Sequence, residues 1–105
     1  YVKDCIDIMM WLLENPDKNG VINVGTGRAS TWNELANALF KALKKEPDIQ
    51  YIDMPDSIKN QYQYFTQAKM EKLTALGYTK PFTRLEDAVE DYVLNYLNKD
   101  NRYLS

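Results

Sequence analysis

VINVGTGRASTWNE, residues 21–34, is the stretch that decides the fold class. Its apolar run at 21–24 is typical of a short buried strand, and the two glycines that follow end that strand. Thr31 and Glu34 have the spacing of a capping box, in which each side chain accepts a hydrogen bond from the backbone amide of the other residue. The stretch therefore predicts a strand, a glycine loop and a helix in succession.

Outward from this unit, apolar periodicity predicts further elements on both sides. The expected elements are, in order, a helix at 2–13, a strand at 21–24, a helix at 32–43, a strand at 49–54, an extended segment at 62–65, a helix capped by Thr66 and ended by Gly77, a helix opened by Thr83 and running to Leu97, and a polar tail at 98–105. This order predicts an α/β fold with a small sheet covered by helices, in one domain spanning 1–105.

Charge and composition exclude several classes of protein. The 105 residues carry 13 Lys+Arg and 15 Asp+Glu, so nothing in the balance favours nucleic acid or an anionic membrane as a partner. The longest apolar run, Ile8 to Leu13, is far shorter than the roughly 20 residues that cross a bilayer. With one cysteine, Cys5, and no histidine, we expect no metal site, and a lone thiol is typical of a cytoplasmic protein.

The first helix has more apolar surface than this domain is expected to cover. Met9, Met10 and Trp11 would face water unless another body of protein lies against them. We therefore expect helix 1–15 to pack on a missing N-terminal part, and the start at Tyr1 rather than Met points the same way. The alternative is that both faces are covered within the domain.

The glycine loop lies between a strand and a helix, where free amides can hold a phosphate. However, Ser30 stands where the dinucleotide fingerprint needs a third glycine, and the Gly-Lys-Ser/Thr ending of a Walker loop is absent. A structural turn is the favoured interpretation, with Arg28 as a solvated group. We expect no cofactor-binding residue here.

Acid–base chemistry lacks its usual groups in this sequence. There is no histidine, and no tyrosine is followed four residues later by the lysine that short-chain dehydrogenases place there. The acids between Glu86 and Asp91 are typical of a solvated helix face. Carboxylates, lysines and tyrosines remain as candidates, but the catalytic Tyr–Lys pair of short-chain dehydrogenases is not in this chain.

Residues 59–65, KNQYQYF, alternate hydrogen-bonding groups with aromatic faces. Sugars are bound by such sets, because aromatic faces pack on sugar CH groups while polar groups meet the hydroxyls. The alternative is an edge strand whose aromatic rings pack on the core. Trp32, Tyr92 and Tyr96 are interpreted as core or interface residues.

Several strings resemble a known family, the extended short-chain dehydrogenase/reductases that act on nucleotide-sugars. They are YVKD at 1–4, VINVGTG at 21–27, LGY at 76–78 and Pro81. Longer strings are similar to the ADP-L-glycero-D-manno-heptose 6-epimerase family in particular: GTGRA at 25–29, YQYFTQA at 62–68 and GYTKPF at 77–82.

The resemblance implies a C-terminal substrate domain whose Rossmann domain, with NADP and the catalytic Tyr and Lys, lies outside this chain. It implies inversion at C6 of ADP-heptose through a 6-keto intermediate, homo-oligomers of five subunits, and a role in making the lipopolysaccharide core. By the same resemblance, Tyr62 contacts the substrate and Lys59 lies on the diphosphate side. The chain alone is then expected to be inactive.

Three positions depart from that family. Asn60 replaces a glycine, Gln61 a basic residue and Lys69 an acid, which leaves the local contacts to the substrate open. Another nucleotide-sugar epimerase or dehydratase is a second hypothesis, although the string around Tyr62 argues against it. A third is a non-catalytic interaction domain whose first helix binds a partner.

Overall fold

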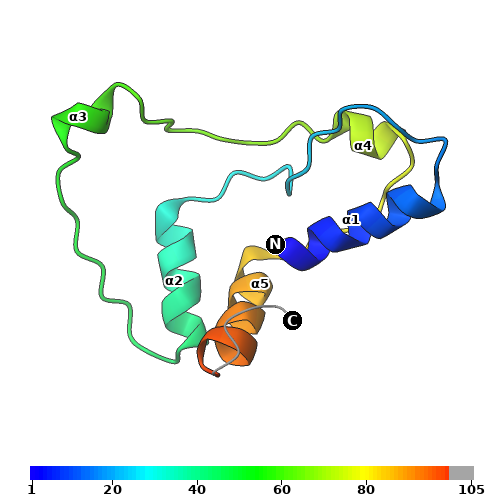
Figure 1. The fold of residues 1–105 in the computed structure, drawn as a ribbon. Helices are drawn as coiled ribbons and strands as arrows, with labels where there is room; N and C mark the ends of the chain where they lie inside the picture. The colour runs from blue at the N-terminus through cyan, green and yellow to red at the C-terminus, as the bar shows by residue number, and fades with distance from the viewer. Residues whose placement is uncertain (100–105) are drawn as a thin grey trace. The chain divides into compact units, whose positions relative to one another are not determined.

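The computed structural model describes residues 1–99 as helices joined by irregular segments (Figure 1). The elements are α1 (Val2–Glu14), α2 (Trp32–Ala42), α3 (Asp56–Lys59), α4 (Glu71–Ala75), α5 (Leu85–Tyr92) and the π-helix η1 (Val93–Leu97). They form two compact units: Tyr1–Ala29 with Gln67–Arg84, and Ser30–Thr66 with the chain from Leu85 onward. The expected polar tail lies outside the described residues from position 100 onward.

The sheet that the sequence predicts is not formed by residues 1–99. The segments 21–24 and 49–54 are irregular, and the Val21 and Ile52 side chains are 89% and 84% exposed. A strand is stable only when a neighbouring strand satisfies its backbone groups and a packed face covers its side chains. Neither segment has such a neighbour among the described residues. The small sheet is therefore not confirmed among residues 1–99, although the helical expectations largely hold.

In the first unit, α1 and α4 enclose a small core. Ile8, Leu73 and Tyr78 are buried together. Trp11 lies edge-on to Tyr78, with ring centroids 5.3 Å apart. The partly buried residues that surround this cluster are Trp11, Leu12, Ile22, Met70 and Phe82. The helix expected at 2–13 is confirmed, and Trp11, which we expected to need cover from another body of protein, lies against Tyr78.

A buried carboxylate ties α1 to the end of this unit. Asp4 is 9% exposed, and its two oxygens accept hydrogen bonds from the Thr83 backbone N–H at 3.0 Å and from the Thr83 hydroxyl at 2.7 Å. Paired in this way, the charge is stabilised despite its burial. The aspartate of the YVKD string thus fixes the chain just before α5 begins.

The short helix α4 begins later than expected. Its N-cap is Met70 rather than Thr66, whose hydroxyl donates to the Gln63 side-chain oxygen at 3.2 Å. The expected end is confirmed, because Gly77 follows the C-cap with a φ of +109°. Glycine accepts that backbone conformation without the steric penalty that a Cβ would bring.

In the second unit, α2 packs along α5 and η1, and Figure 1 shows α2 (cyan) beside α5 (orange). Ala38, Ala42 and Val93 are buried at this contact, and two alanines allow the helices to approach closely. The capping box predicted for α2 is confirmed. The Glu34 amide donates to the Thr31 hydroxyl at 3.1 Å, and the Thr31 amide donates to the Glu34 carboxylate at 3.0 Å.

Candidate functional site

Tyr62, the principal candidate from the sequence, lies in the second unit shortly after α3. Its hydroxyl accepts a hydrogen bond from the indole N–H of Trp32, with 2.6 Å between the nitrogen and the oxygen. Its ring meets the Tyr64 ring edge-on, with centroids 5.1 Å apart. The structure therefore brings three aromatic residues together, which we call the aromatic cluster: Trp32, Tyr62 and Tyr64.

Most of this aromatic surface faces outward. Trp32 is 72% exposed and Tyr64 is 77% exposed, and Phe65 is also exposed. An edge strand packed on the core would bury these rings, so that interpretation is wrong. Trp32 is not a core residue either. Exposed aromatic faces beside a phenol hydroxyl have the chemical character that binds sugar or base rings.

Lys59, the second candidate, ends the single turn of α3 and is exposed. Its side chain makes no hydrogen bond or ion pair with another residue in 1–99. It precedes Tyr62 by three residues, but no contact joins it to the aromatic cluster. Its ammonium group is therefore available to an anion, and the structure does not assign it one.

The glycine loop is filled by the chain itself. A Cβ built on Gly25 would lie 2.7 Å from the Ala68 Cβ, and one on Gly27 would lie 3.1 Å from Met70 Cγ. The Gln67 side-chain amide donates to the Gly27 carbonyl. Two strings of the family resemblance, 25–29 and 62–68, therefore meet at this loop, and the glycines are explained by close packing.

These contacts argue against a cofactor site at the loop. The Thr26 hydroxyl is engaged by its own turn, accepting from the Arg28 amide at 3.1 Å and donating to the Arg28 carbonyl at 3.0 Å. The space above the glycines holds Ala68 and Met70 rather than an opening. The structural turn is the interpretation that these contacts favour.

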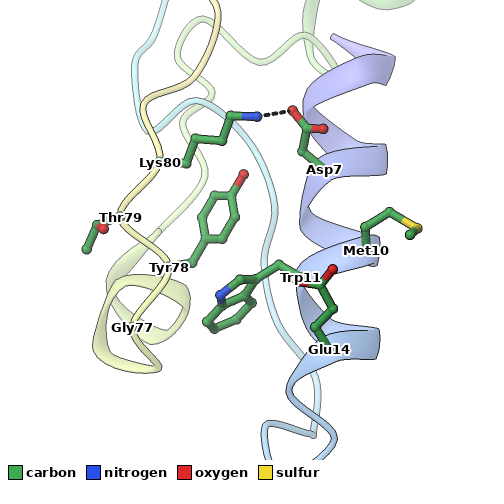
Figure 2. A pocket seen from close by; sticks show the side chains of 8 residues that line it. All are labelled: Asp7, Met10, Trp11, Glu14, Gly77, Tyr78, Thr79 and Lys80. Atoms are coloured by element: carbon green, nitrogen blue, oxygen red, sulfur yellow. Dashed lines mark hydrogen bonds and ion pairs between the residues drawn. The ribbon is translucent and has the colours of Figure 1, made fainter.

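A concave region of about 350 Å³ lies between α1 and the segment after α4 (Figure 2). Trp11 and Tyr78 form one wall, and the Lys80 ammonium and the Asp7 carboxylate lie together with 2.6 Å between nitrogen and oxygen. The hydrogen bond to Asp7 is the main cause that raises the pKa of Lys80 above its ordinary value. Because the two charges offset each other, this region is a weak site for an anion.

A second groove, of about 400 Å³, runs between α2 and the α5–η1 pair and is almost entirely apolar. Trp32 stands at one end of it, with Leu35 and Leu39 from α2 facing Tyr92 and Leu97. No set of polar groups lines this groove to orient a substrate. The groove is therefore explained by the packing of apolar helix faces. The interpretation of Tyr92 as an interface residue agrees with this position.

The described part of the chain has neither a cluster of metal ligands nor a helix that could cross a membrane. Residues 1–99 contain no group of three or more His, Cys, Asp or Glu placed to hold a metal ion. Likewise, the helices formed by these residues are all too short or too polar to cross a membrane.

Sequence reasoning missed the role of Trp32. The signal was present, because a capping box places the residue after its threonine at the first position of a helix, where a side chain easily reaches a neighbouring loop. The sequence does not show the hydrogen-bond partner of the Trp32 indole, because Tyr62 lies thirty residues further along the chain.

Comparisons with known proteins give a consistent result. No model of a protein family matches the chain. It is 53% identical over 104 residues to an ADP-L-glycero-D-manno-heptose-6-epimerase of Nitratidesulfovibrio vulgaris strain DP4, covering 99% of this chain and 32% of that protein. The identity to the protein of that name from strain Hildenborough is 56% over 97 residues, covering 92% and 30%.

A third protein of the same name, from Fusobacterium nucleatum, is 44% identical over 110 residues, covering 99% of this chain and 33% of that protein. The chain thus spans about a third of the length of the curated relatives that it matches. The resemblance stated from the sequence motifs is confirmed.

Proposed function

We propose that this chain is the substrate-binding portion of an ADP-L-glycero-D-manno-heptose 6-epimerase, an isomerase that inverts C6 of the heptose through a 6-keto intermediate. The observation that carries the proposal is the 53% identity to a protein of that name over nearly the whole chain. The exposed aromatic cluster adds support, because it has the chemistry expected of a nucleotide-sugar contact.

In this proposal the chain binds sugar and leaves the redox step to the rest of the protein. NADP and the acid–base tyrosine and lysine belong to the remaining two-thirds of the enzyme. Two observations support this division: the glycine loop is closed by Ala68 and Met70, and no tyrosine in the chain has a lysine four residues later. The chain by itself is then inactive.

The exposed side of α1 is proposed to pack on that remaining part. Ile6, Met9 and Leu13 are all exposed, although Ile8 on the same helix is buried in the core. A helix with apolar residues on both sides is stable in water only when both sides are covered.

Within the site, Tyr62 is proposed to contact the substrate and Lys59 to face the diphosphate. The ring of Tyr62 offers an apolar face and its hydroxyl a hydrogen-bond donor, whereas Lys59 offers an exposed positive charge. The family resemblance alone supports the further proposals of a five-subunit homo-oligomer, a cytoplasmic location and a part in making the lipopolysaccharide core.

The test uses the complete protein that contains this chain, assayed for conversion of ADP-D-glycero-D-manno-heptose into its C6 epimer. Tyr62→Ala is expected to lower kcat/KM by about tenfold or more, because one ring contact and one hydrogen bond are lost together. Tyr51→Ala is the control, since Tyr51 is another tyrosine of the second unit, 75% exposed, and lies outside the aromatic cluster.

Equal kinetics for Tyr62→Ala and the wild type would remove Tyr62 from the site. Failure of the wild-type enzyme to convert ADP-heptose, together with activity on a hexose nucleotide, would replace the proposed substrate by another nucleotide-sugar.

A further inference from the structure

Trp32 has an unusual combination of exposure and fixed geometry. Its side chain is 72% exposed, yet the one polar atom of the indole is engaged by Tyr62 at 2.6 Å. A large exposed ring adds little to a core, so its stability role is small. The hydrogen bond to Tyr62 is therefore the most specific interaction of the Trp32 side chain.

The backbone under Trp32 is held on both sides. The preceding Thr31 and the following Glu34 exchange the two hydrogen bonds of the capping box, which sets the first turn of α2. Trp32 also lines the apolar groove, together with Leu35 and Tyr92. The indole N–H is thus presented to Tyr62 from a fixed helix start.

This bond also decides what the Tyr62 hydroxyl can offer to a ligand. An indole N–H only donates, whereas a phenol hydroxyl accepts and donates. Because the Tyr62 oxygen accepts from Trp32, its own proton is free to be donated to another acceptor. The Tyr64 ring also contacts Tyr62, edge-on, with centroids 5.1 Å apart.

We propose that Trp32 is a positioning residue, which orients Tyr62 and commits its hydroxyl to donating a hydrogen bond to an oxygen acceptor of the bound nucleotide-sugar. The inference rests on the proposed function for the substrate contact of Tyr62. It adds a residue to the site that neither the sequence motifs nor the relatives' names assign.

A double-mutant cycle in the complete enzyme tests this proposal, with the variants Trp32→Phe, Tyr62→Phe and the two combined. Trp32→Phe keeps an aromatic ring at the helix start and removes only the N–H. It is expected to raise KM for ADP-heptose by about three- to tenfold, the equivalent of one neutral hydrogen bond, with little change in kcat. In the Tyr62→Phe background the same change is expected to have no further effect.

Trp11→Phe is the matched control, because Trp11 is the other tryptophan of the chain and packs on Tyr78 in the first unit. It is expected to change stability without changing KM. Equal effects of Trp32→Phe in the wild-type and Tyr62→Phe backgrounds would overturn the proposal, since Trp32 would then act by another route.

A second readout does not depend on the substrate. In the complete enzyme with isotope-labelled tryptophan, the indole N–H resonance of Trp32 is expected to shift on Tyr62→Phe, whereas that of Trp11 stays in place. An unmoved Trp32 resonance would overturn the proposal. A shifted resonance in an enzyme that does not convert ADP-heptose would support the Trp32–Tyr62 pair while rejecting the proposed substrate.

Discussion

Two helix ends in this protein use the same hydrogen bonds with different residues. After α2, the Lys44 amide donates to the Lys41 carbonyl at 3.0 Å and the Lys45 amide donates to the Phe40 carbonyl at 2.9 Å. After α4, the Gly77 amide donates to the Thr74 carbonyl at 3.0 Å and the Tyr78 amide donates to the Leu73 carbonyl at 3.3 Å. Both ends are Schellman motifs.

The difference lies in what each end is packed against. At α4, the two residues of the wider hydrogen bond are Leu73 and Tyr78, which are both buried in the core. At α2, the corresponding residue Lys45 is exposed, and a lysine rather than a glycine takes the left-handed conformation, with a φ of +56° at Lys44. The first end is therefore stabilised by packing, whereas the second carries the backbone penalty of a non-glycine residue in the left-handed region.

The largest effect is expected from removing the packing at α4. Leu73→Ala is expected to lower the free energy of unfolding by about 2–5 kcal/mol, because a leucine that is 1% exposed leaves a cavity behind. Val21→Ala is the control, since Val21 lies in the same unit and is 89% exposed, and its effect is expected within about 0.5 kcal/mol. Urea unfolding followed by tryptophan fluorescence measures both, and equal losses would show that the core is not where the structure puts it.

A smaller loss is expected from the backbone of the same end. Gly77→Ala has room for the new methyl group, because its Cβ would lie 3.9 Å from the Trp11 ring, so the cost comes from the φ of +109°. We expect a destabilisation of about 1–2 kcal/mol, measured by thermal unfolding. Gly77→Asn, which tolerates positive φ better, should lose less. A neutral Gly77→Ala would contradict the conformation at this position.

The smallest effect has the opposite sign. Lys44→Gly is expected to stabilise the protein by about 0.5 kcal/mol, because relief of the left-handed backbone outweighs the added freedom of the unfolded chain. Lys45→Gly is the control and should destabilise, since Lys45 does not have a positive φ. A loss of stability in both variants would mean that the two ends differ less than the backbone indicates.

Local signals in the sequence were sufficient for the helices. The capping box of Thr31 and Glu34, the stop at Gly77 and the apolar pattern of α1 depend on residues close together in the chain, and the structure confirms them. The start of α4 was misplaced because Thr66, a good cap residue, uses its hydroxyl on Gln63 instead. When a polar side chain has several possible hydrogen-bond partners nearby, the sequence alone does not show which of them it bonds to.

The sheet and the site depended on more distant partners. Residues 21–24 have strand composition, but composition does not provide a second strand to pair with. In the same way, Tyr62 was singled out by its motif, whereas its contact with Trp32 arises only when the fold brings residues thirty positions apart together.

The meeting of Gly25 and Ala68 limits how this sequence can vary. A Cβ on Gly25 would lie 2.7 Å from that of Ala68, so the two positions share a volume that holds a single methyl group. Gly25 can therefore gain a side chain only if Ala68 shifts or loses its methyl group. The substitutions that are tolerated at one position therefore depend on the residue at the other, although more than forty residues separate the two in the chain.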